Sequence, residues 1–366
     1  MIHAVPTDSS LSKPVLLMAG GTGGHVFPAL AIAEGLRARG IVVCWLGTRR
    51  GLESRVVPAA DIDIKYISIS GLRGKSRLSL VMAPFKIILA LWQSLRVLRA
   101  LRPAVVVGMG GFVTGPGGIA AWLLGIPLLI HEQNAIAGLT NRWLARFASQ
   151  VMEAFPGTFP KRYHALHTGN PLRAHIMALG DAAERKVHNP LRVLVIGGSL
   201  GAKALNETVP KALAKMTGMI EVWHQTGEAH VETMQSAYLH APFQAKVEAF
   251  IEDMGAAYGW ADIVICRAGA LTVSELAQAG VASILVPYPY AVDDHQTHNA
   301  QFLTQKGAAI LLPQTELTVE KLATLMTEFY DNPSRLAAMS EAARRCATPT
   351  ALQQVVELVV KVMGNR

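Results

Sequence analysis

Short apolar runs alternate along this chain with longer segments in which apolar residues recur every three or four positions. The runs predict buried strands at residues 15–18, 42–46, 104–107, 127–130, 191–196, 263–265 and 283–286. Helical spacing follows most of these runs, and strand-helix-strand repeats of this kind build parallel sheets. We therefore expect an α/β fold.

Glycine-rich turns stand directly after several of the predicted strands. They are GGTGGHVFP at residues 20–28, GMGGFVTGPGG at 108–118 and GGSLGA at 197–202. Helices are predicted behind them at residues 28–39, 119–124 and 203–216. A glycine turn before a helix lets an anion approach free backbone N–H groups and the positive end of the helix dipole. Each turn therefore predicts a phosphate site at the carboxyl end of a strand, where open α/β sheets bind ligands.

A dinucleotide-binding fold is the natural alternative, because it also places glycines after its first strand. That fold uses GxGxxG spacing and an acidic residue at the end of its second strand. Here the first turn has GGTGG spacing, and the second strand runs into Arg49 and Arg50. NAD is therefore disfavoured, whereas the arginine pair leaves an NADP-dependent reductase open.

Polar side chains with possible catalytic roles stand close to these turns. His25 closes the first glycine turn, and a neutral imidazole can accept a proton from a sugar hydroxyl near neutral pH, although a lone histidine is more often structural. The sequence HEQN at residues 131–134 follows a predicted strand. The loop at residues 293–299 offers more hydrogen-bonding groups than a turn needs.

Glu275 lies about one turn into the helix that follows Gly269. There its carboxylate can accept hydrogen bonds from sugar hydroxyls beside a bound phosphate. Residues 272–275 also have the spacing of a capping box, in which Glu275 would return to the backbone of its own helix. Local sequence leaves the two interpretations equally open, and the polar loop at 293–299 favours ligand binding.

The length of 366 residues and an apolar content of 51% predict two domains, each with its own core. The three cysteines stand far apart, so we expect buried thiols rather than disulfides or metal ligands. The first ten residues lack a basic segment followed by an apolar core, so no signal peptide is expected.

Positive charge is concentrated in the first half of the chain. The net charge is +8, of which residues 1–170 carry +11 and residues 171–366 carry −3. Such a field attracts anionic lipid, diphosphate or nucleic acid, and nucleic acid ranks last because no recognition motif accompanies the charge. A helix at about 79–101 combines apolar and cationic residues, which predicts docking on an anionic bilayer surface; an ordinary packed helix is the alternative. The predicted membrane face comprises Arg73, Lys75, Arg77, Leu80, Ile87 and Leu91.

Five segments, in order, resemble the MurG family of bacterial glycosyltransferases: GGTGGHVFP, GMGGFVTGPGG, HEQNAIAGLTN, GALTVSE and DDHQTHNA. The resemblance covers nearly the whole chain and implies a GT-B fold, with two Rossmann-like domains whose parallel sheets face a central cleft. It implies a membrane-facing acceptor domain at residues 1–170 and a UDP-GlcNAc-binding domain at 171–348. A C-terminal helix, residues 349–366, would pack back on the first domain.

The activity implied by the resemblance is inverting transfer of N-acetylglucosamine from UDP-GlcNAc to the MurNAc C4 hydroxyl of undecaprenyl-diphosphate-MurNAc-pentapeptide. This reaction converts lipid I to lipid II in peptidoglycan synthesis, on the cytoplasmic face of the plasma membrane, by a peripheral enzyme. We expect no cofactor and no metal, because the sequence has no Cys/His cluster and no DxD at a strand end. The implied partners are UDP-GlcNAc, lipid I, an anionic membrane surface and other cell-wall synthesis proteins.

The resemblance also implies roles for individual residues. His25 is the candidate base, and Glu132 is a weaker alternative. Gly110 and Gly111 are implied in binding the acceptor diphosphate. The residues implied in UDP-GlcNAc binding are Thr22, Gly23, Gly24, Asn134, Arg173, Ser199, Ile251, Ala270, Leu271, Thr272, Val273, Ser274, Glu275, Gln296 and Asn299.

One position departs from the family pattern. The third glycine turn of the family usually carries glutamine where this chain has Leu200, so any polar contact of that side chain is lost. A UDP-GlcNAc 2-epimerase shares the fold and the donor but would not need the basic apolar face. A non-enzymatic membrane adaptor would use only that face and would leave the polar loop at 293–299 unexplained.

Overall fold

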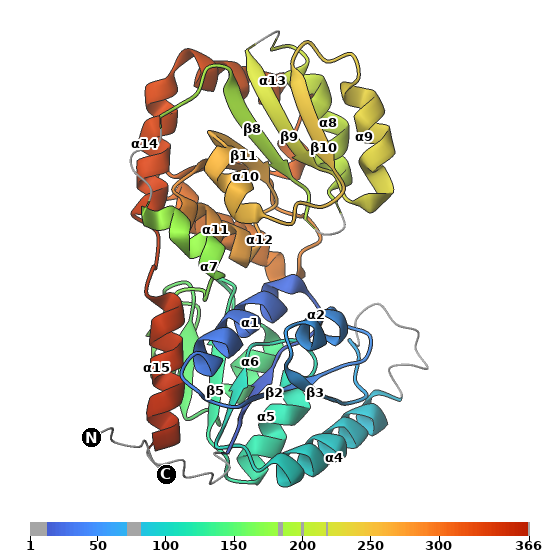
Figure 1. Cartoon of the computed structure of the whole chain (residues 1–366), viewed down its shortest axis with the longest axis vertical. Helices are drawn as coiled ribbons and strands as arrows, with labels where there is room; N and C mark the ends of the chain where they lie inside the picture. The colour runs from blue at the N-terminus through green and yellow to red at the C-terminus, as the bar shows by residue number, and fades with distance from the viewer. Residues whose placement is uncertain (1–12, 72–81, 182–185, 199–200, 217–218, 365–366) are drawn as a thin grey trace, which may run out of the picture. The chain divides into compact units, whose positions relative to one another are not determined.

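The computed structural model describes residues 13–71, 82–181, 186–198, 201–216 and 219–364, and Figure 1 traces the whole chain. The chain divides into two compact units. The first unit comprises Met1–Gln133, Ala137–Pro171 and Thr350–Arg366, and the second comprises Asn134–Ile136 and Leu172–Pro349. The C-terminal segment thus belongs to the first unit, and a short segment around Asn134 belongs to the second.

The first unit is built on a seven-stranded sheet in which every neighbouring pair is parallel. Its strands are β1 (Val15–Met18), β2 (Val43–Gly47), β3 (Asp63–Tyr66), β4 (Val105–Gly108), β5 (Leu128–Glu132), β6 (Gln150–Glu153) and β7 (Leu166–His167). They are arranged in the order β3-β2-β1-β4-β5-β6-β7. The central strands are fully buried, which is why their sequences are continuous apolar runs.

Helices cover both faces of this sheet. On one face lie α1 (Gly23–Arg37) and the C-terminal helix α15 (Ala351–Gly364), which share a core with Leu17 and Trp45. On the other lie α4 (Ala83–Leu101), α5 (Thr114–Leu123) and α6 (Leu139–Leu144), packed against Leu16 and Leu46. The short helix α2 (Glu53–Ala59) connects β2 to β3. Alternate residues of each strand therefore serve two separate cores.

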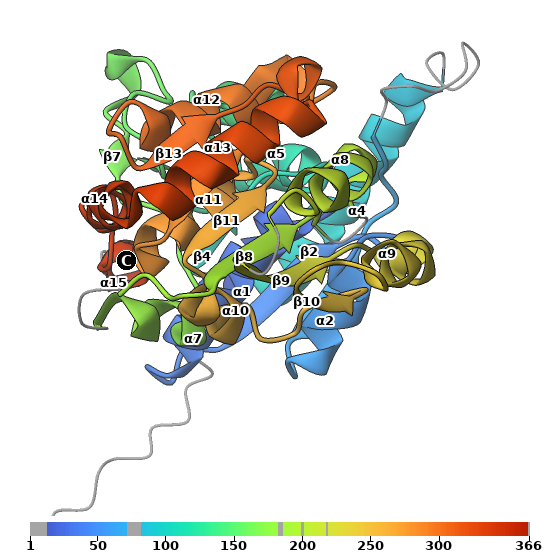
Figure 2. The ribbon, with the colours of Figure 1, turned by 90° about the horizontal axis from the view of Figure 1, so that it is seen from above.

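The second unit repeats this plan with a six-stranded parallel sheet. Its strands are β8 (Leu191–Ile196), β9 (Ile220–Gln225), β10 (Gln244–Glu248), β11 (Ile263–Cys266), β12 (Ala282–Leu285) and β13 (Ala309–Leu311). Figure 2 shows α8 (Lys203–Leu213) beside α13 (Val319–Asp331), and both pack into the core on one face of the sheet. The remaining helices are α7 (Ala174–Met177), α9 (Val231–Tyr238), α10 (Met254–Trp260), α11 (Ala270–Ala279), α12 (His295–Thr304) and α14 (Pro333–Arg344).

Both sheets have the same strand order around the centre. In the first unit β1 lies between β2 and β4, and in the second β8 lies between β9 and β11. The direction of winding reverses between β1 and β4 and again between β8 and β11, and ligands of doubly wound sheets bind beside that reversal, at the carboxyl ends of the strands. The predicted α/β class with two Rossmann-like domains is confirmed.

Two helices begin earlier than the sequence predicts. Helix α1 begins at Gly23 rather than near Pro28, and α5 begins at Thr114 rather than at Ile119. Glycine and proline favour turns, but buried apolar packing further along each helix extends the helical conformation into the glycine run. His25 consequently lies within the first turn of α1.

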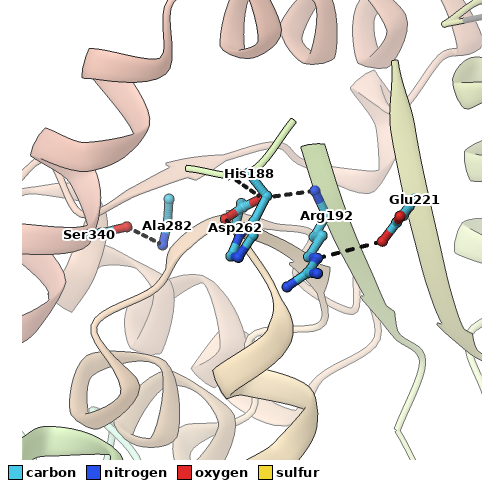
Figure 3. Close-up of polar contacts among 6 residues, drawn as sticks. All are labelled: His188, Arg192, Glu221, Asp262, Ala282 and Ser340. Atoms are coloured by element: carbon cyan, nitrogen blue, oxygen red, sulfur yellow. Dashed lines mark hydrogen bonds and ion pairs between the residues drawn. The ribbon is translucent and has the colours of Figure 1, made fainter. Parts of the chain in front are cut away.

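A polar cluster connects the amino ends of β8 and β11 in the second sheet (Figure 3). Asp262, directly before β11, accepts hydrogen bonds from the backbone N–H groups of His188 (3.2 Å) and Arg192 (2.9 Å). The His188 ring nitrogen Nδ1 lies 2.8 Å from the same carboxylate. This cluster lies at the amino ends of the strands, whereas the glycine turns lie at their carboxyl ends. We therefore assign it a structural role.

Candidate functional site

The two glycine turns of the first unit meet at the reversal point of its sheet. A Cβ on Gly111 would lie 2.4 Å from the carbonyl oxygen of Gly20, and Gly111 has φ +83°, so only glycine fits there. A Cβ on Gly110 would lie 3.0 Å from Nδ1 of His25. The structure therefore brings His25, Gly110 and Gly111 together beside the turn that carries Thr22, Gly23 and Gly24.

A buried carboxylate that the sequence analysis missed holds the first turn in place. The Glu53 side chain accepts hydrogen bonds from the N–H of Gly21 (3.0 Å) and from both the N–H (2.9 Å) and hydroxyl (2.8 Å) of Thr48. A Cβ on Gly51 would overlap the Glu53 carboxylate. An acidic residue at the start of a short helix normally indicates exposure, so nothing in the sequence pointed to this role.

His25 lies at one end of a hydrogen-bonded row of side chains. Its Nδ1 is 2.8 Å from Oε1 of Gln133, whose Nε2 is 3.0 Å from Nδ1 of His131. Nε2 of His131 is 3.0 Å from the carbonyl oxygen of Gly169. His131 and Gln133 are buried, and desolvation lowers the pKa of His131 to about 4, against the opposing effect of the Gly169 carbonyl.

Glu132, the alternative base, is buried at the end of β5. Its Oε2 accepts hydrogen bonds from the N–H of Gly138 (3.0 Å) and from Nδ2 of Asn141 (2.9 Å). These bonds fix the loop between β5 and α6. A carboxylate engaged in this way is poorly placed to take a proton from a substrate, so the geometry favours His25 as the base.

In the second unit, glycine turns follow β8 and β11 at the reversal point. A Cβ on Gly201 would lie 2.1 Å from the carbonyl oxygen of Thr226, so this turn also needs glycine. Ser199 and Leu200 lie outside the described residues. The predicted donor-binding stretch from Ala270 to Glu275 forms the first two turns of α11, directly after Gly269. Of these residues, Leu271, Thr272 and Ser274 are partly exposed.

Glu275 does not act in a capping box. Helix α11 begins at Ala270 with Gly269 as its N-cap, so Thr272 lies inside the helix rather than at its end. The Glu275 carboxylate instead accepts a hydrogen bond from the hydroxyl of Tyr258 (3.0 Å) and lies 3.5 Å from Nη2 of Arg173. Burial raises the pKa of Glu275, while Arg173 and Tyr258 act in the opposite direction.

Asn299 joins the predicted Asn134 to the turn after β11. Its Nδ2 donates to the carbonyl oxygen of Ala268 (3.2 Å) and to Oδ1 of Asn134 (3.3 Å), and its Oδ1 accepts from the N–H of Ala135 (2.8 Å). Because Asn299 is fully buried, its first role is to position Asn134. Ile251, expected to contact a ligand through its backbone, is also buried.

Gln296 is partly exposed in the first turn of α12. Its Oε1 accepts a hydrogen bond from the N–H of Tyr288 (2.8 Å). This bond orients the amide group, and no other described residue makes a hydrogen bond to its Nε2. Gln296 can therefore donate to a ligand hydroxyl.

The residues of the predicted membrane face differ in how exposed they are. Arg73, Lys75, Arg77 and Leu80 lie outside the described residues. Ile87 is exposed on α4, but Leu91 packs against the core of the first unit and does not belong to an exposed face. The exposed large apolar side chains of α4 are instead Phe85, Ile87, Ile88, Leu89 and Trp92.

Within the described residues, no three His, Cys, Asp or Glu side chains are grouped as metal ligands would be. No helix in this described part of the chain is both long and apolar enough to span a bilayer.

Comparisons with known proteins place both units in one family. Residues 15–153 match the glycosyltransferase family 28 N-terminal domain, and residues 192–356 match the family 28 C-terminal domain. A UDP-N-acetylglucosamine--N-acetylmuramyl-(pentapeptide) pyrophosphoryl-undecaprenol N-acetylglucosamine transferase of Marinobacter nauticus is 54% identical, over 98% of this chain and 100% of the relative. The protein of the same name from Methylococcus capsulatus is 53% identical, over 97% and 100%.

Solved structures agree in fold. The crystal structure of Acinetobacter baumannii MurG is 47% identical and covers 95% of this chain and 99% of its own, with a TM-score of 0.81. A UDP-N-acetylglucosamine 2-epimerase structure has a TM-score of 0.68 at 14% identity, over 97% of this chain and 96% of its own. At 14% identity this second likeness shows the fold alone. Together with the MurG structure it confirms the prediction of a GT-B fold.

Proposed function

The chain belongs to the MurG branch of glycosyltransferase family 28, and from this membership we propose that it transfers N-acetylglucosamine from UDP-GlcNAc to lipid I in peptidoglycan synthesis. In this proposal the acceptor is the C4 hydroxyl of the MurNAc residue, the product has a β linkage, and no metal takes part. The observation that carries the proposal is His25, which lies in the first turn of α1 between two glycine turns at the reversal point of the sheet.

The proposed chemistry is a single displacement. His25 accepts the proton as the acceptor O–H bond breaks, the acceptor oxygen forms a bond to C1 of GlcNAc, and the bond from C1 to the UDP oxygen breaks. One displacement inverts the configuration at C1. The departing diphosphate gains negative charge, which backbone N–H groups at the start of α8 and α11, together with Arg173, are suited to stabilise.

We further propose that the second unit binds UDP-GlcNAc. Glu275 and the first turns of α11 would contact the ribose and diphosphate, and Gln296 would donate to a hexose hydroxyl, with Asn134 and Asn299 beside it. The backbone at Ile251 would contact the uracil ring. The buried bonds of Asn299 and the fixed amide of Gln296 support this arrangement, because a preorganised site loses little entropy on binding.

Gln296→Ala should reduce the discrimination between UDP-GlcNAc and its C4 epimer by about 10-fold, because an amide that donates to a specific hydroxyl rejects a substrate that leaves it unpaired. The measurement is the ratio of kcat/KM for the two donors. Gln305→Ala, at the other end of the same helix, is the matched control and should leave the ratio unchanged. An unchanged ratio in Gln296→Ala would place hydroxyl recognition elsewhere.

Glu275→Gln should change stability in a pH-dependent way. Because burial raises the pKa of Glu275, the folded state holds the proton more tightly than the unfolded state does. The contribution of Glu275 to the free energy of unfolding is complete below the ordinary pKa of 4.5 and is lost as pH rises through the folded-state value. The Gln variant, which does not titrate, should therefore gain stability relative to the wild-type protein as pH rises above 4.5, as measured by denaturant unfolding.

A difference in unfolding free energy that stays constant as pH rises above 4.5 would contradict this account of Glu275. The same variant also tests the donor contact, because losing a charge-assisted hydrogen bond to the ribose should raise KM for UDP-GlcNAc by about 10-fold or more.

We also propose that the first unit docks peripherally on the cytoplasmic face of the plasma membrane. Helix α4 exposes five large apolar side chains between Phe85 and Trp92, and Arg96 stacks over the Trp92 ring at 4.7 Å. Apolar side chains beside cationic ones suit an anionic bilayer surface. Other cell-wall synthesis proteins remain proposed partners.

UDP release from UDP-GlcNAc, with and without a lipid I analogue, tests the proposed function. The transferase should release UDP only when the acceptor is present. UDP release without acceptor, accompanied by a 2-epimerised sugar, would support the epimerase that shares this fold. Absence of UDP release with acceptor present would contradict the proposal.

A further inference from the structure

Three side chains of the first unit form one hydrogen-bonded row that ends on a backbone carbonyl. His25 contacts Oε1 of Gln133, Gln133 contacts Nδ1 of His131, and His131 contacts the carbonyl oxygen of Gly169. His131 and Gln133 are almost completely buried. The position of each proton along this row can be assigned in turn, because every buried donor needs an acceptor and every buried acceptor needs a donor.

The Gly169 end of the row fixes the proton on His131. A carbonyl oxygen only accepts hydrogen bonds, so Nε2 of His131 must donate across the 3.0 Å contact. Burial lowers the pKa of His131 to about 4, so near pH 7 the ring is neutral and carries a single proton. Nδ1 of His131 therefore presents a lone pair toward Gln133.

The amide of Gln133 can then lie in only one orientation. Its Nε2 faces two acceptors, Nδ1 of His131 at 3.0 Å and the carbonyl oxygen of His131 at 3.1 Å. Turning the amide round would place its oxygen against both acceptors. The carbonyl oxygen would keep a hydrogen bond from Nδ2 of Asn141 (3.2 Å), but Nδ1 of His131 would be left without a donor, which is costly in a buried site. Oε1 of Gln133 consequently faces Nδ1 of His25, and because this oxygen only accepts, His25 must donate from Nδ1.

We propose that Gln133 and His131 are positioning residues that hold His25 in the tautomer protonated at Nδ1, which leaves the lone pair on Nε2 to accept the proton of the acceptor hydroxyl. This inference rests on the proposed function and deepens it. Gly110 supports the arrangement sterically, because its missing side chain leaves room for the His25 ring. No described residue makes a hydrogen bond to Nε2 of His25.

The proton balance of the step is simple. The acceptor O–H bond breaks, a new N–H bond forms at Nε2, and Nδ1 keeps its proton throughout. The imidazolium that results donates a stronger, charge-assisted hydrogen bond to Oε1 of Gln133. An amide oxygen does not take that proton, so Gln133 orients the base and stabilises its charged form without relaying a proton to His131.

The direct test is the tautomer of His25 in the wild-type protein. Protonated and unprotonated imidazole nitrogens have widely separated ¹⁵N chemical shifts, so long-range ¹H–¹⁵N spectra of histidine-labelled protein distinguish the two tautomers. The His25 signals are assigned by their loss in His25→Asn, at a pH high enough that they no longer move. We expect a protonated Nδ1 and an unprotonated Nε2. A protonated Nε2 in the wild-type protein would by itself overturn the inference.

Variants then connect the tautomer to catalysis. Gln133→Met keeps the length of the side chain but neither donates nor accepts, so the Nδ1–H signature should be lost and kcat should fall by about 100-fold. KM for UDP-GlcNAc should stay within about 2-fold, because the donor contacts lie elsewhere.

Gln150→Met, on the neighbouring strand β6, is the matched control and should change neither the His25 signals nor kcat. A Gln133→Met protein with normal kcat, or with low kcat and an unchanged tautomer, would contradict the positioning role. Failure of the proposed function would differ from either result, because the wild-type protein would then transfer no sugar whatever the tautomer of His25.

Discussion

His25→Ala should lower kcat for transfer to a lipid I analogue by about 1,000-fold while UDP-GlcNAc still binds with its wild-type affinity. The acceptor hydroxyl is a poor nucleophile until a base removes its proton, and His25 places a titratable ring beside Gly110 at the junction of the two glycine turns. Donor affinity is measured separately, by titration calorimetry with UDP-GlcNAc in the absence of acceptor.

His240→Ala is the control for removing a histidine, because His240 is exposed in the second unit. It should retain full activity. A His25→Ala protein that keeps more than about one tenth of wild-type kcat would show that the base lies elsewhere, since loss of general-base catalysis costs at least about 100-fold. In that event Glu132→Gln becomes the next variant to measure.

Replacing Phe85, Ile88 and Trp92 with serine should reduce binding to anionic lipid vesicles by about 100-fold. These side chains are 66%, 65% and 51% exposed on α4. Burying each of them partly in the bilayer interface should contribute about 1 kcal/mol, so the three contribute about 3 kcal/mol together. The apolar part resists added salt, whereas attraction of Lys86, Arg96 and Arg99 to the bilayer is screened by it.

Leu239→Ser provides the matched control, because Leu239 is 74% exposed in the second unit and should not affect vesicle binding. Sedimentation with vesicles at low and high salt is the measurement. The triple variant should keep its melting temperature and its affinity for UDP-GlcNAc, because the altered side chains are mostly exposed. Undiminished sedimentation of the triple variant at high salt would contradict the assignment of α4 as the docking surface.

Apolar runs located the central strands of both sheets, because these strands are buried on both faces, but they did not locate the strands nearer the edges, such as β7 and β10. The run at 15–18 became β1 with the same bounds, and glycine placed after strands marked both reversal points. Those turns depend on local backbone conformations that only glycine adopts readily, so the glycines in the sequence indicate them directly. The first residues of helices were harder to predict. Gly23 and Thr114 are poor helix formers, but tertiary packing stabilises them in the helical conformation at the start of α1 and α5.

Residues that act through distant partners could not be found from spacing. Glu53 reaches back to Gly21 across 32 positions, and nothing near it in the sequence indicates a buried carboxylate. His131 and Gln133 belong to the HEQN motif, but their role depends on His25 from a different part of the chain. Only the three-dimensional arrangement shows which atoms face one another.

Helix α4 shows a different limit. Apolar residues occupy most of its circumference, so periodicity cannot show which side the core covers. The structure places Leu91 and Leu98 toward the sheet and leaves Phe85 and Trp92 exposed.

The most direct test of the proposed function is transfer of radiolabelled sugar from UDP-GlcNAc to a lipid I analogue by the purified full-length chain. The labelled product is extracted with the lipid and digested with a β-specific hexosaminidase. We predict that label enters the lipid only when enzyme and acceptor are both present, that the hexosaminidase releases it, and that a metal chelator does not prevent the transfer. Label that stays in the aqueous phase when the enzyme is folded and the acceptor is present would contradict the assignment.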